Sequence, residues 1–115
     1  MISEPHKWTK LENHPITVIE LAGEIDSNKK VEGIEEIATG EETEHVALIM
    51  ENVTYINSRA CGQLVIFHKA VENHGFHLYL VKTPPAVTSV IECLGIDNIL
   101  HMKEDLKEVI REVET

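Results

Sequence analysis

The sequence predicts an α/β domain in which helices pack on a mixed β-sheet of four or five strands. Strand-like and helix-like segments alternate along the chain after an initial pair of strands, which indicates a largely parallel sheet with one antiparallel pair. The continuous apolar run at residues 46–50 (VALIM) is typical of a strand buried on both faces. With 115 residues, 43% of them hydrophobic, the chain suits one packed core. We therefore expect a single domain over residues 1–115, with its helices gathered on one face of the sheet.

The first half of the chain supplies the strand pair and the central strand. Residues 16–22 (ITVIELA) are rich in β-branched side chains and predict a strand, and residues 6–12 predict a weaker edge strand beside it. Apolar residues then recur at helical spacing within residues 27–40, from a possible serine N-cap to a glycine. We expect a buried strand at 46–50 and a polar connection over 52–57.

The second half predicts three helices and two strands. Apolar residues step by three and four across residues 59–73, the pattern of a helix face, and His-Gly ends it. Residues 76–81 predict a strand, residues 83–95 a helix opened by two prolines, residues 96–100 a short last strand, and residues 106–113 a final helix. The inward positions of the last two helices are expected to be Val87, Ile91, Leu94, Leu106, Val109, Ile110 and Val113.

The charge balance argues against two classes of partner. The chain has 20 acidic and 10 basic residues, a formal net charge of −10, which repels both a phosphate backbone and an anionic lipid surface. No stretch reaches the roughly 20 apolar residues that span a bilayer. We expect a cytoplasmic protein with no nucleic-acid or membrane partner. A partner with a basic face suits this charge, although the charge also serves solubility alone.

No motif for catalysis or cofactor binding is present. The sequence has no GxxxxGK[ST], GxGxxG or GxSxG pattern, so we expect neither enzymatic activity nor a cofactor. Seven histidines are scattered along the chain; His74 and His77 are three apart but have no cysteine nearby, so no metal site is expected. Cys61 and Cys93 suit buried free thiols. A nucleophilic pair of Cys61 with a histidine remains an alternative to a core thiol.

Ser58 stands where a strand gives way to a helix. Its hydroxyl is placed to act as an N-cap, accepting from the backbone N–H of Ala60 or Cys61. The same serine would also be exposed at the positive end of a helix, where a phosphate is stabilised by free N–H groups and the helix dipole. A structural cap and a site of reversible phosphorylation are both open interpretations.

Four segments, in this order and spacing, carry a resemblance to a known family. They are Gly23-Glu24-Ile25-Asp26, the run 46–50, Ile56-Asn57-Ser58 followed by Gly62, and Pro85-Ala86-Val87 with Leu94-Gly95-Ile96 downstream. Through them residues 14–112 resemble the anti-sigma factor antagonists, the bacterial family built on the STAS domain. The chain departs from the family pattern where Asn57 replaces an aspartate, Ala60 replaces a glycine and Arg59 replaces a small residue.

The resemblance implies a phosphorylation-controlled protein-binding module that switches partners through Ser58. The unmodified protein would bind an anti-sigma factor or a serine kinase with a histidine-kinase-like ATP fold. A serine phosphatase would reset the modified form. The expected partner-binding residues are Glu24, Asp26, Asn57, Ser58 and Arg59. The alternative is a non-switching STAS scaffold subunit of a larger signalling or transport complex, in which Ser58 is only a cap. A small-molecule or nucleotide binder is a third hypothesis, supported by fold analogy alone.

Overall fold

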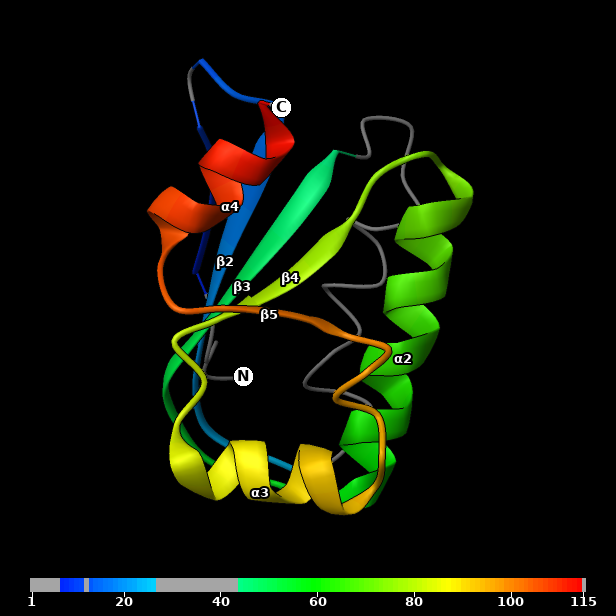
Figure 1. The fold of residues 1–115 in the computed structure, drawn as a ribbon. Coiled ribbons are helices and arrows are strands. Elements are labelled where there is room, and N and C mark those ends of the chain that lie inside the picture. The colour runs from blue at the N-terminus through cyan, green and yellow to red at the C-terminus, as the bar shows by residue number, and fades with distance from the viewer. Residues whose placement is uncertain (1–6, 12, 27–43, 115) are drawn as a thin grey trace, which may run out of the picture.

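The computed structural model describes residues 7–11, 13–26 and 44–114, which form a β-sheet with helices packed on it (Figure 1). The helix expected within residues 27–40 lies outside the described residues. The strands are β1 (Lys7–Lys10), β2 (Ile16–Ile25), β3 (His45–Ile56), β4 (Leu78–Val81) and β5 (His101–Lys103), and the helices are α2 (Ser58–Asn73), α3 (Pro85–Cys93) and α4 (Leu106–Val113).

The five strands form one mixed sheet in the order β1-β2-β3-β4-β5. β1 runs antiparallel to β2, and the remaining neighbours pair in parallel. The predicted α/β class, the strand number and the initial antiparallel pair are confirmed. Parallel pairing places the carboxyl ends of β2, β3 and β4 at the same end of the sheet, where connecting segments commonly carry binding sites.

β3 is the central strand and is covered on both faces. Val46, Leu48 and Met50 are fully buried in the larger apolar cluster, together with residues of α2 and α3. Ala47 is fully buried in a second cluster on the opposite face, with Ile49 packed against it. The uninterrupted apolar run that predicted a strand buried on both faces is therefore confirmed.

The helices lie on both faces of the sheet, whereas all of them were expected on one face. α2 and α3 cover the larger cluster, whereas Val109 of α4 is fully buried against Ile16, Ala47 and Tyr79 on the other side of the sheet. Figure 1 shows α4 across the strands from α2. The reason is the composition of the strands, because apolar residues at successive positions leave both faces of the sheet in need of cover.

β3 is longer than the sequence predicted. The expected connection over residues 52–57 is strand as far as Ile56, because this part continues to pair with the end of β2, where Ile25 lies opposite Ile56. Val53 and Ile56 point inward and are buried. Thr54 and Tyr55, which lie between them, occupy exposed positions of the strand, so the expectation of a connecting loop is wrong.

The segment between α3 and β5 also differs from the prediction. α3 ends at Cys93, and Leu94, expected on its inner face, is 44% exposed. The expected strand over 96–100 is a turn instead, because the Leu100 N–H donates to the Ile96 carbonyl. β5 begins at His101 and is only three residues long.

α4 is held to the sheet by polar contacts as well as by Val109. The Glu112 carboxylate of α4 accepts hydrogen bonds from the Tyr79 hydroxyl of β4 and the Lys103 ammonium of β5. Burial and the neighbouring Glu112 charge raise the pKa of Tyr79 to about 12, so the phenol stays protonated and continues to donate.

Among the described residues, no helix has the length and apolar character needed to cross a membrane.

The two cysteines differ in accessibility, and this yields a first prediction. Cys61 of α2 is fully buried as expected, and burial raises the pKa of its thiol, whereas Cys93 is exposed, so the expectation of a buried thiol there is wrong. We expect iodoacetamide at pH 8 to alkylate one thiol per chain promptly and the second only after unfolding, because the attacking species is an accessible thiolate. Intact mass spectrometry would follow the reaction. Prompt alkylation of a Cys93→Ser variant would contradict the buried placement of Cys61.

Candidate functional site

The five residues expected to bind a partner lie at one end of the sheet. β2 and β3 run in parallel, and the pairing of Ile25 with Ile56 brings their carboxyl ends side by side. Gly23 adopts a left-handed backbone (φ 78°) at a shift in this register, just before the exposed end of β2. The structure thus places at this end Glu24 of β2, Asp26 just after β2, and Asn57, Ser58 and Arg59 at the β3–α2 junction.

Asn57, not Ser58, caps α2, so the prediction of a Ser58 cap is wrong. Asn57 keeps the extended backbone of the preceding strand (φ −105°, ψ 173°), and its Oδ1 accepts from the Ala60 N–H at 2.9 Å. The Asn57 carbonyl accepts the first bond of the helix from the Cys61 N–H at 3.0 Å. Ser58 is therefore the first helical residue. The shift follows from the length of β3, which stays extended through Ile56 and leaves the cap position to the next residue.

Hydrogen bonds from Asn57 also connect the start of α2 to the end of β2. Its Nδ2 donates to the Asp26 carbonyl at 3.1 Å, and its backbone N–H donates to the Ile25 carbonyl at 3.3 Å. An aspartate at position 57 would retain the capping oxygen but would lack the Nδ2 donor and would face the Asp26 carbonyl with a negative charge. The amide at this position is thus matched to its two neighbours.

Ser58 is exposed on the first turn of α2, beside the exposed Arg59. Its N–H and that of Arg59 precede the first intrahelical bond, so neither has an acceptor within the helix. The first turn of α2 contains no acidic side chain, so no carboxylate of that turn offsets the positive end of its dipole. The Ser58 hydroxyl therefore stands in a position that favours an added anion.

Two exposed large hydrophobic side chains at this end of the molecule were not singled out from the sequence. Ile66 shares the exposed side of α2 with Arg59 and Gly62, and its side chain is 55% exposed. Tyr55, 49% exposed, lies next to Glu24 in the register of β2 and β3. Spacings of three and four along α2 place these helix residues on one face. The same helical spacing that identifies the buried face of α2 was the signal in the sequence for this exposed face.

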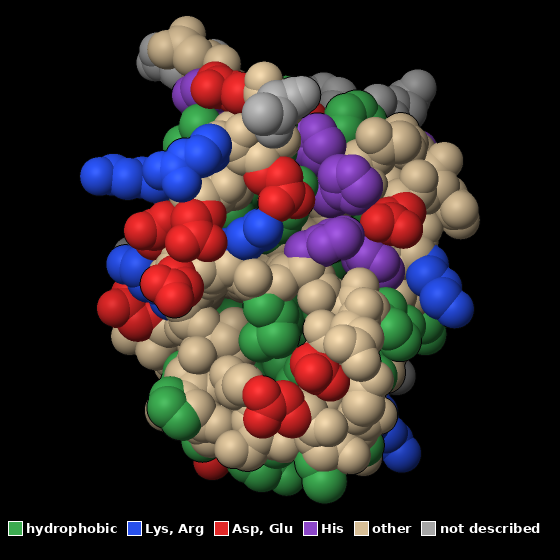
Figure 2. All heavy atoms as spheres, in the orientation of Figure 1, with side chains coloured by type: hydrophobic (Ala, Val, Ile, Leu, Met, Phe, Trp, Pro, Cys, Tyr) green, Lys and Arg blue, Asp and Glu red, His purple; other side chains and the backbone are tan. Residues whose placement is uncertain are grey.

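The opposite end of α2 holds a second group of polar residues. Histidines that are scattered in the sequence gather there on the surface, as the purple side chains in Figure 2 show. His68 and Glu72 are four residues apart on α2, and His77 and His101 lie within 3.5 Å of Glu72. Sequence reasoning missed this group because its members come from separate elements. The i, i+4 spacing of His68 and Glu72 was the one local signal.

The assignment of the cap can be tested by stability. We expect Asn57→Ala to lower the free energy of unfolding by about 1–2 kcal/mol, because it removes both the cap and the bond to Asp26. Ser58→Ala should stay within about 0.5 kcal/mol of wild type, because this exposed first-turn hydroxyl supports no other group among the described residues. Urea unfolding followed by circular dichroism would measure both. An equal loss in the two variants would mean that Ser58 carries the capping role.

Solved structures with this fold include candidate and named anti-sigma factor antagonists. A crystal structure of a candidate anti-sigma factor antagonist from Thermotoga maritima superposes with a TM-score of 0.80 at 18% identity, covering 95% of this chain and 94% of that one. The antagonist SpoIIAA in its unphosphorylated form gives 0.74 at 18% identity, covering 96% and 97%. SpoIIAA of Bacillus in its phosphorylated form gives 0.68 at 18% identity, covering 92% and 97%. At this identity the likeness establishes a shared fold.

A search of curated proteins found no matching sequence. The model of the STAS domain family, in contrast, matches residues 7–109, which include every described strand and the sheet end that carries Ser58. The match spans most of the chain and agrees with the five-stranded mixed sheet and with the solved structures that share it. The chain therefore belongs to the STAS domain family.

Proposed function

We propose that this STAS domain is a phosphorylation-controlled protein-binding module of the anti-sigma factor antagonist type, with Ser58 as the switch. Its partner would be an anti-sigma factor or a serine kinase with a histidine-kinase-like ATP fold, and a serine phosphatase would reset it, all in the cytoplasm. The module itself would bind without catalysing a reaction. The observation that carries the proposal is that Asn57 performs the capping, which leaves the exposed Ser58 hydroxyl free for modification.

The domain can accommodate a phosphate at Ser58 without unfolding. A phosphoserine brings a charge of about −1.5 to −2 at pH 7. The first-turn N–H groups and the helix dipole stabilise that charge, and the adjacent Arg59 is a cation on the same exposed turn. Because Ser58 supports none of the contacts that fix the start of α2, its modification would change the surface and leave the packing intact.

A partner seated on this end of the sheet would respond strongly to the modification. The exposed surface combines Glu24, Asp26, Arg59 and the apolar side chain of Ile66, with Gly62 allowing close approach to the helix backbone. Burying a doubly charged phosphate in such an interface carries a large desolvation cost. Unphosphorylated and phosphorylated forms of SpoIIAA share this fold, which supports control by phosphorylation in this type of domain.

The test compares partner binding across the states of one residue. The partner would be captured on the immobilised domain from lysate of the native host, identified by mass spectrometry and purified. We expect Ser58→Ala to bind like wild type, and protein phosphorylated at Ser58 to bind about 100-fold more weakly, which corresponds to about 3 kcal/mol. Ser58→Asp should lose only part of the affinity, because aspartate carries one charge and a different shape. Calorimetry would measure each affinity.

Lys107→Asp is the matched control, because Lys107 is exposed on α4, which packs on the opposite face of the sheet from α2, and the change adds two negative charges. It should bind the partner like wild type. If authentic phosphorylation at Ser58 leaves the affinity unchanged within a factor of two, the switch is refuted and the non-switching scaffold takes its place. Intact mass of the protein from its own host adds a second check, because a switch in use yields a species heavier by one phosphate.

A further inference from the structure

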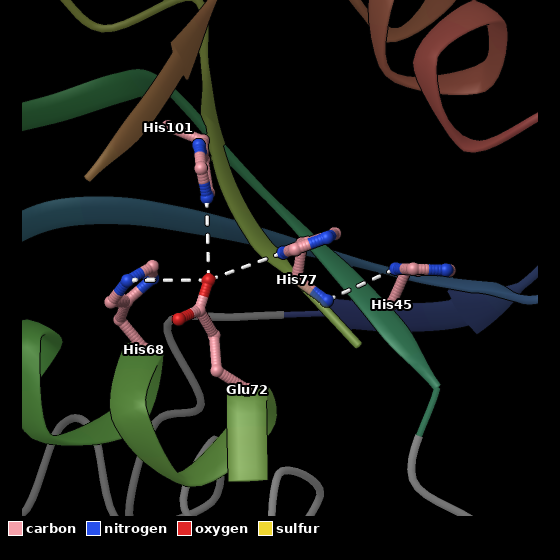
Figure 3. A network of polar contacts seen from close by, with 5 residues as sticks. All are labelled: His45, His68, Glu72, His77 and His101. Carbon is pink, nitrogen blue, oxygen red and sulfur yellow. Dashed lines mark hydrogen bonds and ion pairs between the residues drawn. The ribbon is translucent and has the colours of Figure 1, made fainter. Parts of the chain in front are cut away.

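Three histidines surround one carboxylate at the far end of α2, and a fourth histidine stacks on one of them (Figure 3). Glu72 and His68 belong to α2, His77 immediately precedes β4, and His101 opens β5. The Glu72 Oε2 lies 3.2 Å from His77 Nδ1, 3.5 Å from His101 Nε2 and 3.6 Å from His68 Nε2. The fourth histidine, His45 of β3, stacks on His77 with ring centroids 5.7 Å apart. We call these five residues the histidine cluster.

We propose that His68, Glu72 and His101 bind a divalent transition-metal ion, with Zn²⁺ as its representative. One ligand atom from each of the three lies within 4.8 Å of the other two. A tetrahedral zinc ion with bonds of about 2.0–2.1 Å holds its ligand atoms about 3.4 Å apart. The separations of 3.5 and 3.6 Å between Glu72 Oε2 and the two imidazole nitrogens match that spacing closely.

The donor set selects the class of metal. Imidazole nitrogen suits Zn²⁺, Co²⁺, Ni²⁺ and Cu²⁺, whereas Mg²⁺ and Ca²⁺ prefer sites made of oxygen atoms alone. Two histidines and one carboxylate provide three protein ligands, which leaves a fourth tetrahedral position for water. A cluster of carboxylates alone would carry no such preference, and here two of the three donors are nitrogens.

The state of the imidazoles also suits ligation. His101 Nε2 is buried, and its contact with Glu72 Oε2 at 3.5 Å is longer than an ordinary hydrogen bond, so a metal ion between the two atoms would satisfy both. His68 is only 6% exposed, so its ring is held in place by the surrounding structure beside Glu72. The rings of His68 and His101 lie 5.3 Å apart, so two imidazoles already face a common point beside Glu72.

His77 is placed to orient the carboxylate. A carboxylate oxygen has two lone pairs, so Glu72 Oε2 can accept from His77 Nδ1 and still coordinate an ion with the other. The backbone N–H of His77 in turn donates to His45 Nδ1 at 3.0 Å, which steadies the loop that presents His77. Such outer contacts fix the direction of a ligand and raise affinity, commonly by 10- to 100-fold.

The site would join α2 to an edge of the sheet. β5 is a three-residue strand paired only with β4 among the described elements, and His101 is its first residue. An ion held between α2 and His101 would anchor that strand, so metal binding should stabilise the fold. Ser58 is 14 residues from Glu72 along the same helix, about 21 Å at 1.5 Å per residue. The site is therefore separate from the proposed switch.

The proposal can be tested on the purified, metal-stripped full chain with ZnCl₂ as the probe. Calorimetry should show saturable binding of one Zn²⁺ per chain, and excess Zn²⁺ should raise the melting temperature by roughly 5 °C or more. Glu72→Gln, a near-isosteric change at an exposed residue, should weaken binding at least tenfold, and so should His101→Gln. MgCl₂ should produce neither effect. Co²⁺ in place of Zn²⁺ should give the intense visible absorption of tetrahedral coordination.

His74→Gln is the matched control, because His74 lies at the end of the same helix but contacts the Ala70 carbonyl and not Glu72. It should bind Zn²⁺ like wild type. Circular dichroism would confirm that every variant is folded before its affinity is compared. The proposal is overturned if wild type shows no saturable Zn²⁺ binding, or if folded Glu72→Gln and His101→Gln bind as tightly as wild type. None of these measurements involves a partner protein, so the result is independent of the Ser58 proposal.

Discussion

The parallel pairing of β2 with β3 is the constraint on which the rest of the molecule depends. β3 is buried on both faces by side chains that alternate between two apolar clusters, so a slip of one residue would exchange the contents of the clusters. The same register ends with Ile25 beside Ile56, and Asn57 then bonds to the end of β2 while it caps α2. The position of Ser58 is thus set by sheet register, and no contact of its own side chain is needed.

Those parts of the fold that depend on local patterning could be predicted from the sequence. The run at 46–50 indicated a central buried strand, and the spacing of apolar residues indicated α2 and α4 to within one residue. The face covered by α4 was not predictable, because sequence periodicity identifies a buried side but not the element that covers it. The true length of β3 was missed for a related reason. Around Val53, residues 52–55 show only a weak alternation of polar and apolar side chains. Their extended conformation depends on pairing with β2.

The candidate functional residues differ in the same way. The residues at the sheet end with Ser58 could be grouped from the sequence, because they are contiguous or carry a family pattern. Its detailed chemistry was not, since the choice between Asn57 and Ser58 as the cap depends on where β3 stops being extended. The histidine cluster is assembled from α2, β3, β5 and the loop before β4, and only the fold brings these together. A ligand set drawn from separate elements leaves almost no trace in the order of residues.

Gly62 shows a tension between the stability of this helix and what its surface can do. It lies in the interior of α2, and a methyl group added there would meet nothing within 4 Å. Alanine would therefore fit, and it would stabilise the helix by roughly 0.5–1 kcal/mol, because glycine loses more conformational freedom on folding. That methyl would also thicken the surface one turn beyond Ser58. Replacing glycines to raise the heat resistance of the protein would therefore change the position on α2 where another molecule can come nearest to the helix backbone.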